Sequence, residues 1–149
     1  NLPESYISSG EQRMDIYRRI AALRTSEGAQ ELLDELIDRY GEPPQPVLKL
    51  MDVALLRAEA VQSGICDITQ RGGEIVFTFA AGESMPVEAV MALCIQAKNK
   101  RRLTLSATGT EPKLTLRLAP DEDALESALT LVEDLRVNKE ENEKEVTSC

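Results

Sequence analysis

The residues whose chemistry could be catalytic are few, and three cysteines come first among them. Cys66, Cys94 and Cys149 are widely spaced, and the chain contains no histidine. Neither a disulfide framework nor a zinc site with the usual cysteine and histidine spacing can be drawn from this pattern. The sequence also lacks the commonest general base and the imidazole that usually activates a thiolate. We therefore expect three reduced thiols, with Cys66 and Cys94 as small buried side chains.

The known motifs for phosphate, dinucleotide and metal chemistry are missing from the sequence. It contains no GxxxxGK[ST] loop, no glycine-rich dinucleotide fingerprint and no HExxH pair. Pairs of carboxylates do occur, but on the surfaces of expected helices, where a solvated face is the commoner outcome. The sequence thus predicts no catalytic residue, no metal site and no cofactor in this chain.

Carboxylates are concentrated in one short segment, residues 27–42, where the only basic side chain is Arg39. Glu31, Asp34, Glu35 and Asp38 lie at i, i+3, i+4 and i+7, which places them on one side of a helix. Such a like-charged stripe slightly destabilises an isolated helix, and a basic partner would relieve the repulsion. The stripe is either a docking face or simply a solvated surface.

A compact basic cluster has the sequence Lys98-Asn99-Lys100-Arg101-Arg102. It lies between an expected helix and an expected strand, where it could contact phosphates or satisfy the end of the helix. The net charge of −9 and the aromatic content of 3% argue against general nucleic-acid binding. We favour the helix-terminal role.

Length and composition indicate an ordinary globular chain. Its 149 residues are 42% hydrophobic and 29% charged, which suits one compact domain. No apolar run approaches the ~20 residues of a membrane-spanning helix, and the first residues do not resemble a secretory signal. We expect a cytoplasmic protein with no membrane contact, and the missing initiator methionine suggests a piece of a longer chain.

Three amphipathic helices are expected in the first half of the chain. Apolar residues recur at i, i+3 and i+4 over residues 13–23, 29–40 and 46–61. Thr25 and Ser26 are capping candidates for the second helix, and Gly41 before two prolines ends it.

The apolar period then changes from 3.6 to 2, which predicts strands. A hairpin is expected over residues 65–79, a helix over 86–97, a second pair of strands over 103–106 and 114–118, and a last helix capped by Asp121. The fold class is therefore α+β: an N-terminal three-helix unit followed by ββα-ββα, with a largely antiparallel four-stranded sheet.

The predicted domain organisation is simple. No glycine-rich linker interrupts residues 10–136, so we expect residues 1–136 to form a single α+β regulatory domain. Residues 137–149 are nearly free of apolar side chains and cannot offset the entropy of ordering by burial. They predict a disordered acidic tail.

Residues 2–57 resemble a known family. The segments that carry the resemblance are Leu2-Pro3-Glu4-Ser5-Tyr6-Ile7, Arg13-Met14, Tyr17-Arg18-Arg19-Ile20 and Glu35-Leu36-Ile37-Asp38-Arg39-Tyr40-Gly41-Glu42-Pro43-Pro44. Their order is similar to that of the C-terminal (TRCF) domain of bacterial transcription-repair coupling factors, the Mfd family. From Ile65 onward the resemblance is one of layout.

The resemblance implies a function for the longer protein. Members of this family are ATP-driven DNA translocases, with ATP and Mg in their motor domains, that displace stalled RNA polymerase and recruit nucleotide excision repair. Their C-terminal domain is non-catalytic and autoinhibitory: it docks on the UvrB-like module of the same protein and masks the surface that binds UvrA. RNA polymerase and DNA are contacted by other parts of the parent.

The resemblance also selects an interaction site. The family motif carries Glu35, Asp38 and Arg39, so we expect these residues to form the docking face, with Glu31 and Asp34 beside them. The alternative is an accessory domain that contacts DNA or RNA polymerase, in which the basic cluster would matter and binding would weaken steeply with salt.

Overall fold

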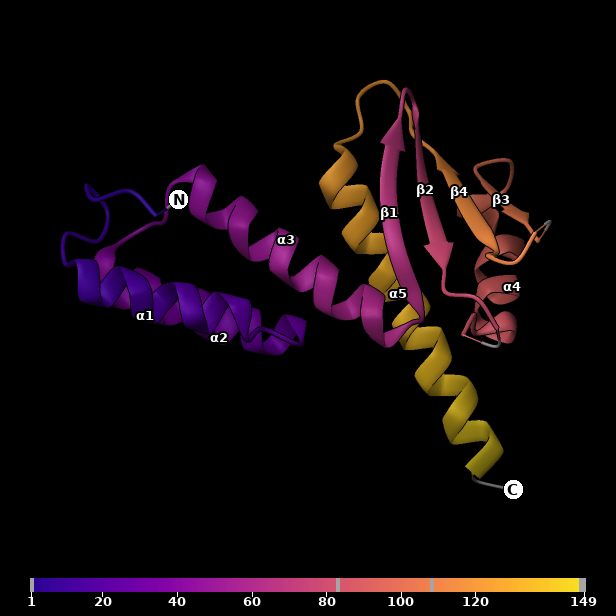
Figure 1. Ribbon diagram of the computed structural model, residues 1–149, viewed down its shortest axis with the longest axis horizontal. Helices are drawn as coiled ribbons and strands as arrows, with labels where there is room; N and C mark the ends of the chain where they lie inside the picture. Colours follow the sequence, from indigo (N-terminus) through magenta and orange to yellow (C-terminus); the bar gives the residue numbers. More distant parts are fainter. Residues whose placement is uncertain (1, 83, 108, 148–149) are drawn as a thin grey trace. The chain divides into compact units, whose positions relative to one another are not determined.

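The computed structural model describes residues 2–82, 84–107 and 109–147, and Figure 1 shows the arrangement of its elements. In chain order these are α1 (Gly10–Ala21), α2 (Ser26–Tyr40), α3 (Gln45–Gln62), β1 (Ile65–Arg71), β2 (Glu74–Phe79), α4 (Val87–Ile95), a 3₁₀ turn (Ala97–Asn99), β3 (Leu103–Ser106), β4 (Lys113–Arg117) and α5 (Ala124–Thr147). The predicted α+β class and the predicted order of helices and strands are confirmed.

The chain forms two compact units, residues 1–58 and 59–149, and the division falls within α3. This differs from the single domain that we predicted for residues 1–136. Val47 and Met51, in the first turns of α3, belong to the core of the first unit. Glu59, near the end of α3, instead pairs with Arg136 of α5. One long helix therefore contributes residues to both units, and no glycine-rich linker marks the division between them.

The first unit has an apolar core built from α1, α2, the start of α3 and the segment before α1. Its buried members are Leu2, Ile7, Ile16, Ile20, Leu23, Leu32, Leu36, Val47 and Met51. Burying a large aliphatic side chain contributes about 1.5–3 kcal/mol, so this cluster is the main source of stability for the unit. The outward sides of α1 and α2 carry mainly polar and charged residues, and Met14 and Ile37 are exposed as well.

Side-chain caps fix where the first two helices begin. Ser9 Oγ accepts a hydrogen bond from the Gln12 N–H at 3.2 Å, so α1 starts at Gly10, three residues before the predicted position. Thr25 Oγ1 accepts from the Gly28 N–H at 3.0 Å, which confirms Thr25 as the cap of α2. At the other end, Gly41 has a φ of 83°, a conformation that glycine adopts without strain.

The second unit is a four-stranded sheet with the order β1-β2-β4-β3, in which all neighbours are antiparallel. The two hairpins join through β2 and β4, where Phe77 lies opposite Leu114. Figure 1 shows α4 and α5 on one face of this sheet. Alternate residues of β2 and β4 are buried, among them Ile75, Phe77, Leu114 and Leu116. The predicted antiparallel sheet is therefore confirmed.

The last helix differs from the prediction at both ends. Asp123 caps it, because its Oδ2 accepts from the Glu126 N–H at 2.9 Å, whereas we had expected Asp121 in this role. The helix then continues to Thr147, through most of the segment predicted as a disordered tail; residues 148 and 149 lie outside the described part. Lys139 Nζ donates to the Gln62 carbonyl at 2.9 Å. Residues 137–147 contain few apolar side chains but many glutamates and lysines. These two residue types are good helix formers, so the segment is helical.

Gly64, between α3 and β1, is the glycine that the fold constrains most. Its φ is +80°, and a Cβ there would lie 2.1 Å from the carbonyl oxygen of Ser84. We predict that Gly64→Ala lowers the free energy of unfolding by on the order of 1–3 kcal/mol or more. Gly73→Ala is the control, because nothing lies within 4 Å of that position. Urea unfolding followed by circular dichroism measures both, and equal stability of the two variants would contradict the prediction.

Candidate functional site

Helix α2 carries the predicted interaction site on the side away from the core. Leu32 and Leu36 are buried, whereas Glu31, Asp34 and Asp38 are exposed. The helical spacing that places the leucines inside therefore places these three carboxylates outside. We call Glu31, Asp34 and Asp38 the outer acidic stripe.

Glu35, the fourth acid of the predicted stripe, behaves differently because α1 holds it. The two guanidinium nitrogens of Arg19 donate to its two carboxylate oxygens, Nη2 to Oε1 at 2.9 Å and Nη1 to Oε2. Arg39 Nη1 donates to the same Oε2 at 3.2 Å, one helical turn along α2. A forked pair of this kind fixes the orientation of both side chains. Glu35 is thus engaged within the unit, although its side chain remains 37% exposed.

The contact with Arg19 sets the charge state of Glu35. The hydrogen bond from Arg19 is the largest cause that lowers the pKa of Glu35, and the same bond raises the pKa of Arg19. The stabilisation from the pair is fully present above the ordinary glutamate pKa of about 4.3. It is lost as the pH falls through the lowered pKa of the folded state. Both partners are therefore charged at neutral pH.

Arg39 and the aromatic side chains fix the end of α2. The Arg39 guanidinium lies 5.0 Å from the centre of the Tyr40 ring. Tyr40 packs edge-on against Tyr6, with ring centres 5.9 Å apart, and the Tyr6 hydroxyl donates to the Gly41 carbonyl at 2.8 Å. Burial is the main reason that the pKa of Tyr6 is raised. These contacts hold Arg39 close to Glu35, and the guanidinium group of Arg39 remains at the surface.

The site therefore has an inner and an outer part. Glu35, Arg39 and Arg19 form the inner part, and the outer acidic stripe forms the other. Our sequence reasoning did not assign a role to Arg19, although a signal was present. Ile16 and Ile20 define the buried side of α1. Arg19, at i+3 from Ile16, lies next to that side, whereas Arg18 points to solvent.

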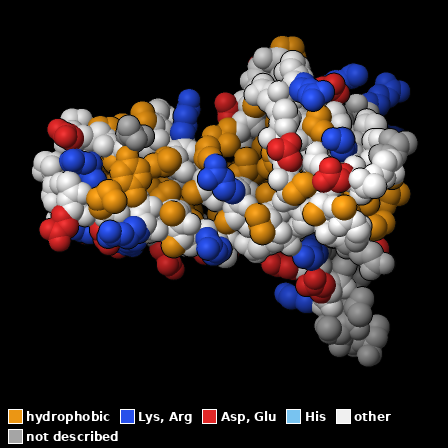
Figure 2. Space-filling model, viewed as in Figure 1, with side chains coloured by type: hydrophobic (Ala, Val, Ile, Leu, Met, Phe, Trp, Pro, Cys, Tyr) orange, Lys and Arg blue, Asp and Glu red, His pale blue; other side chains and the backbone are white. Residues whose placement is uncertain are grey.

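The basic cluster at residues 98–102 is largely paired within its own unit. Lys98 Nζ lies 2.8 Å from Asp134, and Arg102 Nη2 lies 2.5 Å from Glu122. Asn99 Nδ2 donates to the carbonyl of Leu93 at 2.8 Å, near the end of α4. The cluster thus satisfies a carbonyl near the end of α4 and makes an ion pair with α5. On the face drawn in Figure 2, basic and acidic side chains lie close together over the sheet.

The two described cysteines differ from the prediction that both would be buried. Cys66 is exposed near the start of β1, where the pairing with β2 shifts register between Ile65 and Asp67, and its Sγ lies 3.8 Å from Glu111 Oε2. Cys94 is half-buried in α4, and this burial raises the pKa of its thiol. Cys149 lies outside the described residues.

Among residues 2–82, 84–107 and 109–147, no three histidine, cysteine, aspartate or glutamate side chains are placed to hold a metal ion. Within the same ranges, no helix has both the length and the apolar composition needed to cross a membrane.

The fold and the site define a class of protein: a small α+β domain whose most distinctive surface is an acidic helix stabilised by a neighbouring arginine. The sequence profile of the TRCF domain matches residues 1–90. The chain therefore belongs to the TRCF domain family, which confirms the resemblance stated from the sequence.

Similar proteins agree with this assignment. The transcription-repair-coupling factor of Bacillus subtilis (strain 168) is 29% identical over 116 residues, which is 78% of this chain and 10% of that protein. The factor of Escherichia coli (strain K12) is 38% identical over 78 residues, 51% of this chain and 7% of that protein. The chain thus spans about a tenth of the length of these relatives, or less.

A solved structure shares the fold over most of the chain. It is a crystal structure of the C-terminal domain of a transcription-repair coupling factor, with a TM-score of 0.71 and 23% identity. The match covers 94% of this chain and 88% of that one. The fold of this chain is therefore similar to that of a known C-terminal domain.

The Arg19–Glu35 pair leads to a test of the inner part of the site. We predict that Arg19→Met raises the pKa of Glu35 toward its ordinary value, because the largest cause of the lowered pKa is removed. Arg18→Met, a change of the neighbouring exposed arginine, should leave that pKa where it is. A pH titration of the Glu35 side-chain carboxyl by NMR measures both. The same titration curve in all three proteins would show that the pair does not form in solution.

Proposed function

We propose that this chain is the non-catalytic, autoinhibitory C-terminal domain of a transcription-repair coupling factor. The parent protein would be an ATP-dependent DNA translocase of the cytoplasm that displaces stalled RNA polymerase and recruits nucleotide excision repair. The domain docks on the UvrB-like module of the parent and thereby masks the surface that binds UvrA. The observation that carries the proposal is the outer acidic stripe, exposed on a helix that the Arg19–Glu35 pair holds in place.

The geometry of α2 suits docking on a basic surface. Three carboxylates that repel one another are kept on one side of a helix, and positive charges on a partner would relieve that repulsion. Glu35 and Arg39 are already ordered by contacts inside the unit. Ordering a long side chain at an interface costs about 0.5–1.5 kcal/mol, so side chains that are ordered beforehand favour binding.

A weak contact is sufficient for this role. The relatives are about ten times longer than the segment that they share with this chain, so the domain is tethered to its partner in the proposed parent. A flexible tether gives an effective concentration of roughly millimolar. A docking face with little affinity as a separate molecule could therefore keep the domain closed in the intact protein.

The alternative, an accessory domain that contacts DNA or RNA polymerase, has less support. Its best candidate is the basic cluster, in which Lys98 and Arg102 are paired with acids of α5 or the turn before it. Among the described residues of the cluster, Lys100 and Arg101 are exposed and lie outside these two ion pairs. With a net charge of −9 on the chain, two such residues are a small basis for nucleic-acid affinity.

The proposal predicts how UvrA binding changes when the domain is removed. A parent protein truncated just before Leu2 should bind UvrA at least about tenfold more tightly than the intact parent, a coupling of ~1.4 kcal/mol. Asp34→Lys together with Asp38→Lys should shift the intact parent in the same direction, because two charges of the docking face are reversed. Binding at one fixed salt concentration, by calorimetry or interferometry, measures each protein.

The control has the same change of charge in the other unit. Asp121→Lys with Glu141→Lys reverses two exposed acids outside α2 and should leave UvrA binding unchanged. Unchanged binding after truncation would exclude masking and favour the DNA or polymerase alternative. Tighter binding after truncation, combined with no effect of reversal at Asp34 and Asp38, would place the docking contact elsewhere on the domain.

A further inference from the structure

Strand β1 lies at one edge of the four-stranded sheet, because the strand order is β1-β2-β4-β3. Figure 1 shows it without a neighbouring strand on its outer side. The other edge strand, β3, has four residues, whereas β1 has seven. A long edge strand presents backbone N–H and C=O groups that can pair with another strand. The outer side of β1 is therefore the sheet edge with the greater capacity to bind.

The hydrogen bonds of β2 show which of its backbone groups face β1. The Phe79 N–H donates to the Pro112 carbonyl at 2.9 Å, and the Gly73 carbonyl accepts from the Leu118 N–H at 2.7 Å. Both bonds lie on the side of β4, and the backbone groups of successive residues in a strand point to alternate sides. The odd-numbered residues along β2 therefore pair with β4, and the even-numbered ones pair with β1.

The residues of β1 that pair with β2 alternate with residues that face outward. Asp67, Thr69 and Arg71 lie opposite the even-numbered residues of β2. The backbone N–H and C=O groups of Ile68 and Gln70 therefore point away from the sheet. In the part of the chain that the structure describes, these outward groups have no hydrogen-bond partner. They are the donors and acceptors that an additional strand would use.

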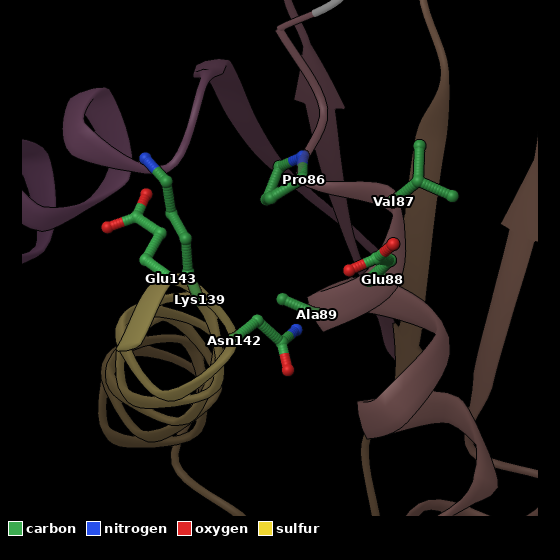
Figure 3. A pocket seen from close by; sticks show the side chains of 7 residues that line it. All are labelled: Pro86, Val87, Glu88, Ala89, Lys139, Asn142 and Glu143. Carbon is green, nitrogen blue, oxygen red and sulfur yellow. The ribbon is translucent and has the colours of Figure 1, made fainter. Parts of the chain in front are cut away.

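The helices of the second unit cover only one face of the sheet. Figure 3 shows α4 and α5 facing each other across a cavity of about 670 Å³, with Ala89 on one wall and Asn142 on the other. Buried Phe77 points to the face that these helices cover, and Ile68 lies opposite it. Successive side chains of a strand point to opposite faces. The side chains of β1 next to Ile68 therefore lie on the face without helices.

The open face of β1 carries one charge of each sign, placed symmetrically about Thr69. Asp67 and Arg71 are both exposed. The Thr69 hydroxyl donates to Asp67 Oδ2 at 2.7 Å. Among the described residues, no carboxylate forms an ion pair with Arg71. The strand is therefore complementary in charge to an antiparallel copy of itself.

We infer that β1 pairs antiparallel with β1 of a second copy of this chain, centred on Thr69. In this register Asp67 of each copy lies opposite Arg71 of the other, at non-hydrogen-bonded positions whose Cα atoms are about 4.5 Å apart. Opposite charges at such positions stabilise a strand pair. The outward backbone groups of Ile68 then meet those of Gln70 in the other copy and form the hydrogen-bonded pairs. The contact has two-fold symmetry, as in most homodimers.

Two features of β1 favour this register over its neighbours. A shift by two residues in either direction leaves Asp67 and Arg71 without an opposite charge. The β1–β2 pairing shifts register between Ile65 and Asp67, so the regular ladder begins at Asp67. The net charge of −9 on each copy opposes association at long range, but the contact itself is neutral. The inference concerns the second unit and does not depend on the function proposed for α2.

Sedimentation equilibrium of the full chain over a range of concentrations should show a monomer–dimer equilibrium. Asp67→Arg leaves only positive charge on the open face of β1, and Arg71→Asp leaves only negative charge. Each variant alone should dimerise about tenfold more weakly. An equimolar mixture of the two should dimerise as tightly as the original chain, because opposite charges face each other again. Glu126→Arg, the same change of charge at an exposed acid of α5, should leave the dimer intact.

Two further variants test the backbone pairing and its register. Gln70→Pro removes an outward N–H that the β1–β2 ladder does not use, so the chain should fold, as circular dichroism can show, but dimerise more weakly. Thr69→Cys, with Cys66, Cys94 and Cys149 replaced by serine, should form a disulfide between copies under mild oxidation. The two facing Cα atoms, about 4.5 Å apart, are within disulfide reach. Gln70→Cys in the same background should cross-link far less.

Three results would overturn the inference. The first is a chain that stays monomeric at every concentration, which would leave the outer side of β1 to a strand of another protein. The second is a dimer that neither Asp67→Arg nor Arg71→Asp weakens, because the contact would then lie elsewhere on the chain. The third is equal cross-linking of Thr69→Cys and Gln70→Cys, which would exclude the register centred on Thr69.

Discussion

The forked ion pair between Arg19 of α1 and Glu35 of α2 is the contact on which the surface of the first unit depends. The apolar core beneath it stabilises the unit, but packing alone leaves long charged side chains free to move. Arg19 and Arg39 both donate to the Glu35 carboxylate, so the charge of Glu35 is engaged within the unit. Glu31, Asp34 and Asp38 remain as the exposed acids of the same helix. The proposed docking face of α2 therefore combines the ordered Arg19–Glu35 pair with the outer acidic stripe beside it.

Internal pairing also explains why the two charged clusters of the sequence differ in what they can do. Lys98 and Arg102 are paired with Asp134 and Glu122, so the basic cluster contributes mainly to contacts within its own unit. The acidic stripe of α2, in contrast, keeps three of its carboxylates exposed. Composition predicts where charge gathers along a chain. The structure adds which of these charges face a neighbour and which face solvent.

Periodic features were predictable from the sequence, and features that depend on distant neighbours were not. Helical spacing and strand alternation gave the order of elements and the acidic side of α2, because both are local. The division within α3 and the pairing of Glu59 with Arg136 involve residues far apart in sequence. Helix formation to Thr147 was missed because we judged order by apolar content, although glutamate and lysine favour helices. Cys66 was expected to be a small buried side chain, but the β1–β2 register shifts between Ile65 and Asp67, and strand alternation in the sequence does not show such a shift.

The most direct test of the docking proposal is carbodiimide labelling of carboxylates, compared between this chain alone and the intact parent protein. Mass spectrometry then reports the reactivity of Glu31, Asp34 and Asp38, with Asp121 and Glu141 as exposed references in the other unit. We predict that the outer acidic stripe reacts in the isolated chain and is protected in the parent, while the references react equally in both. Equal labelling of the stripe in the two proteins would contradict the claim that α2 is the docking face.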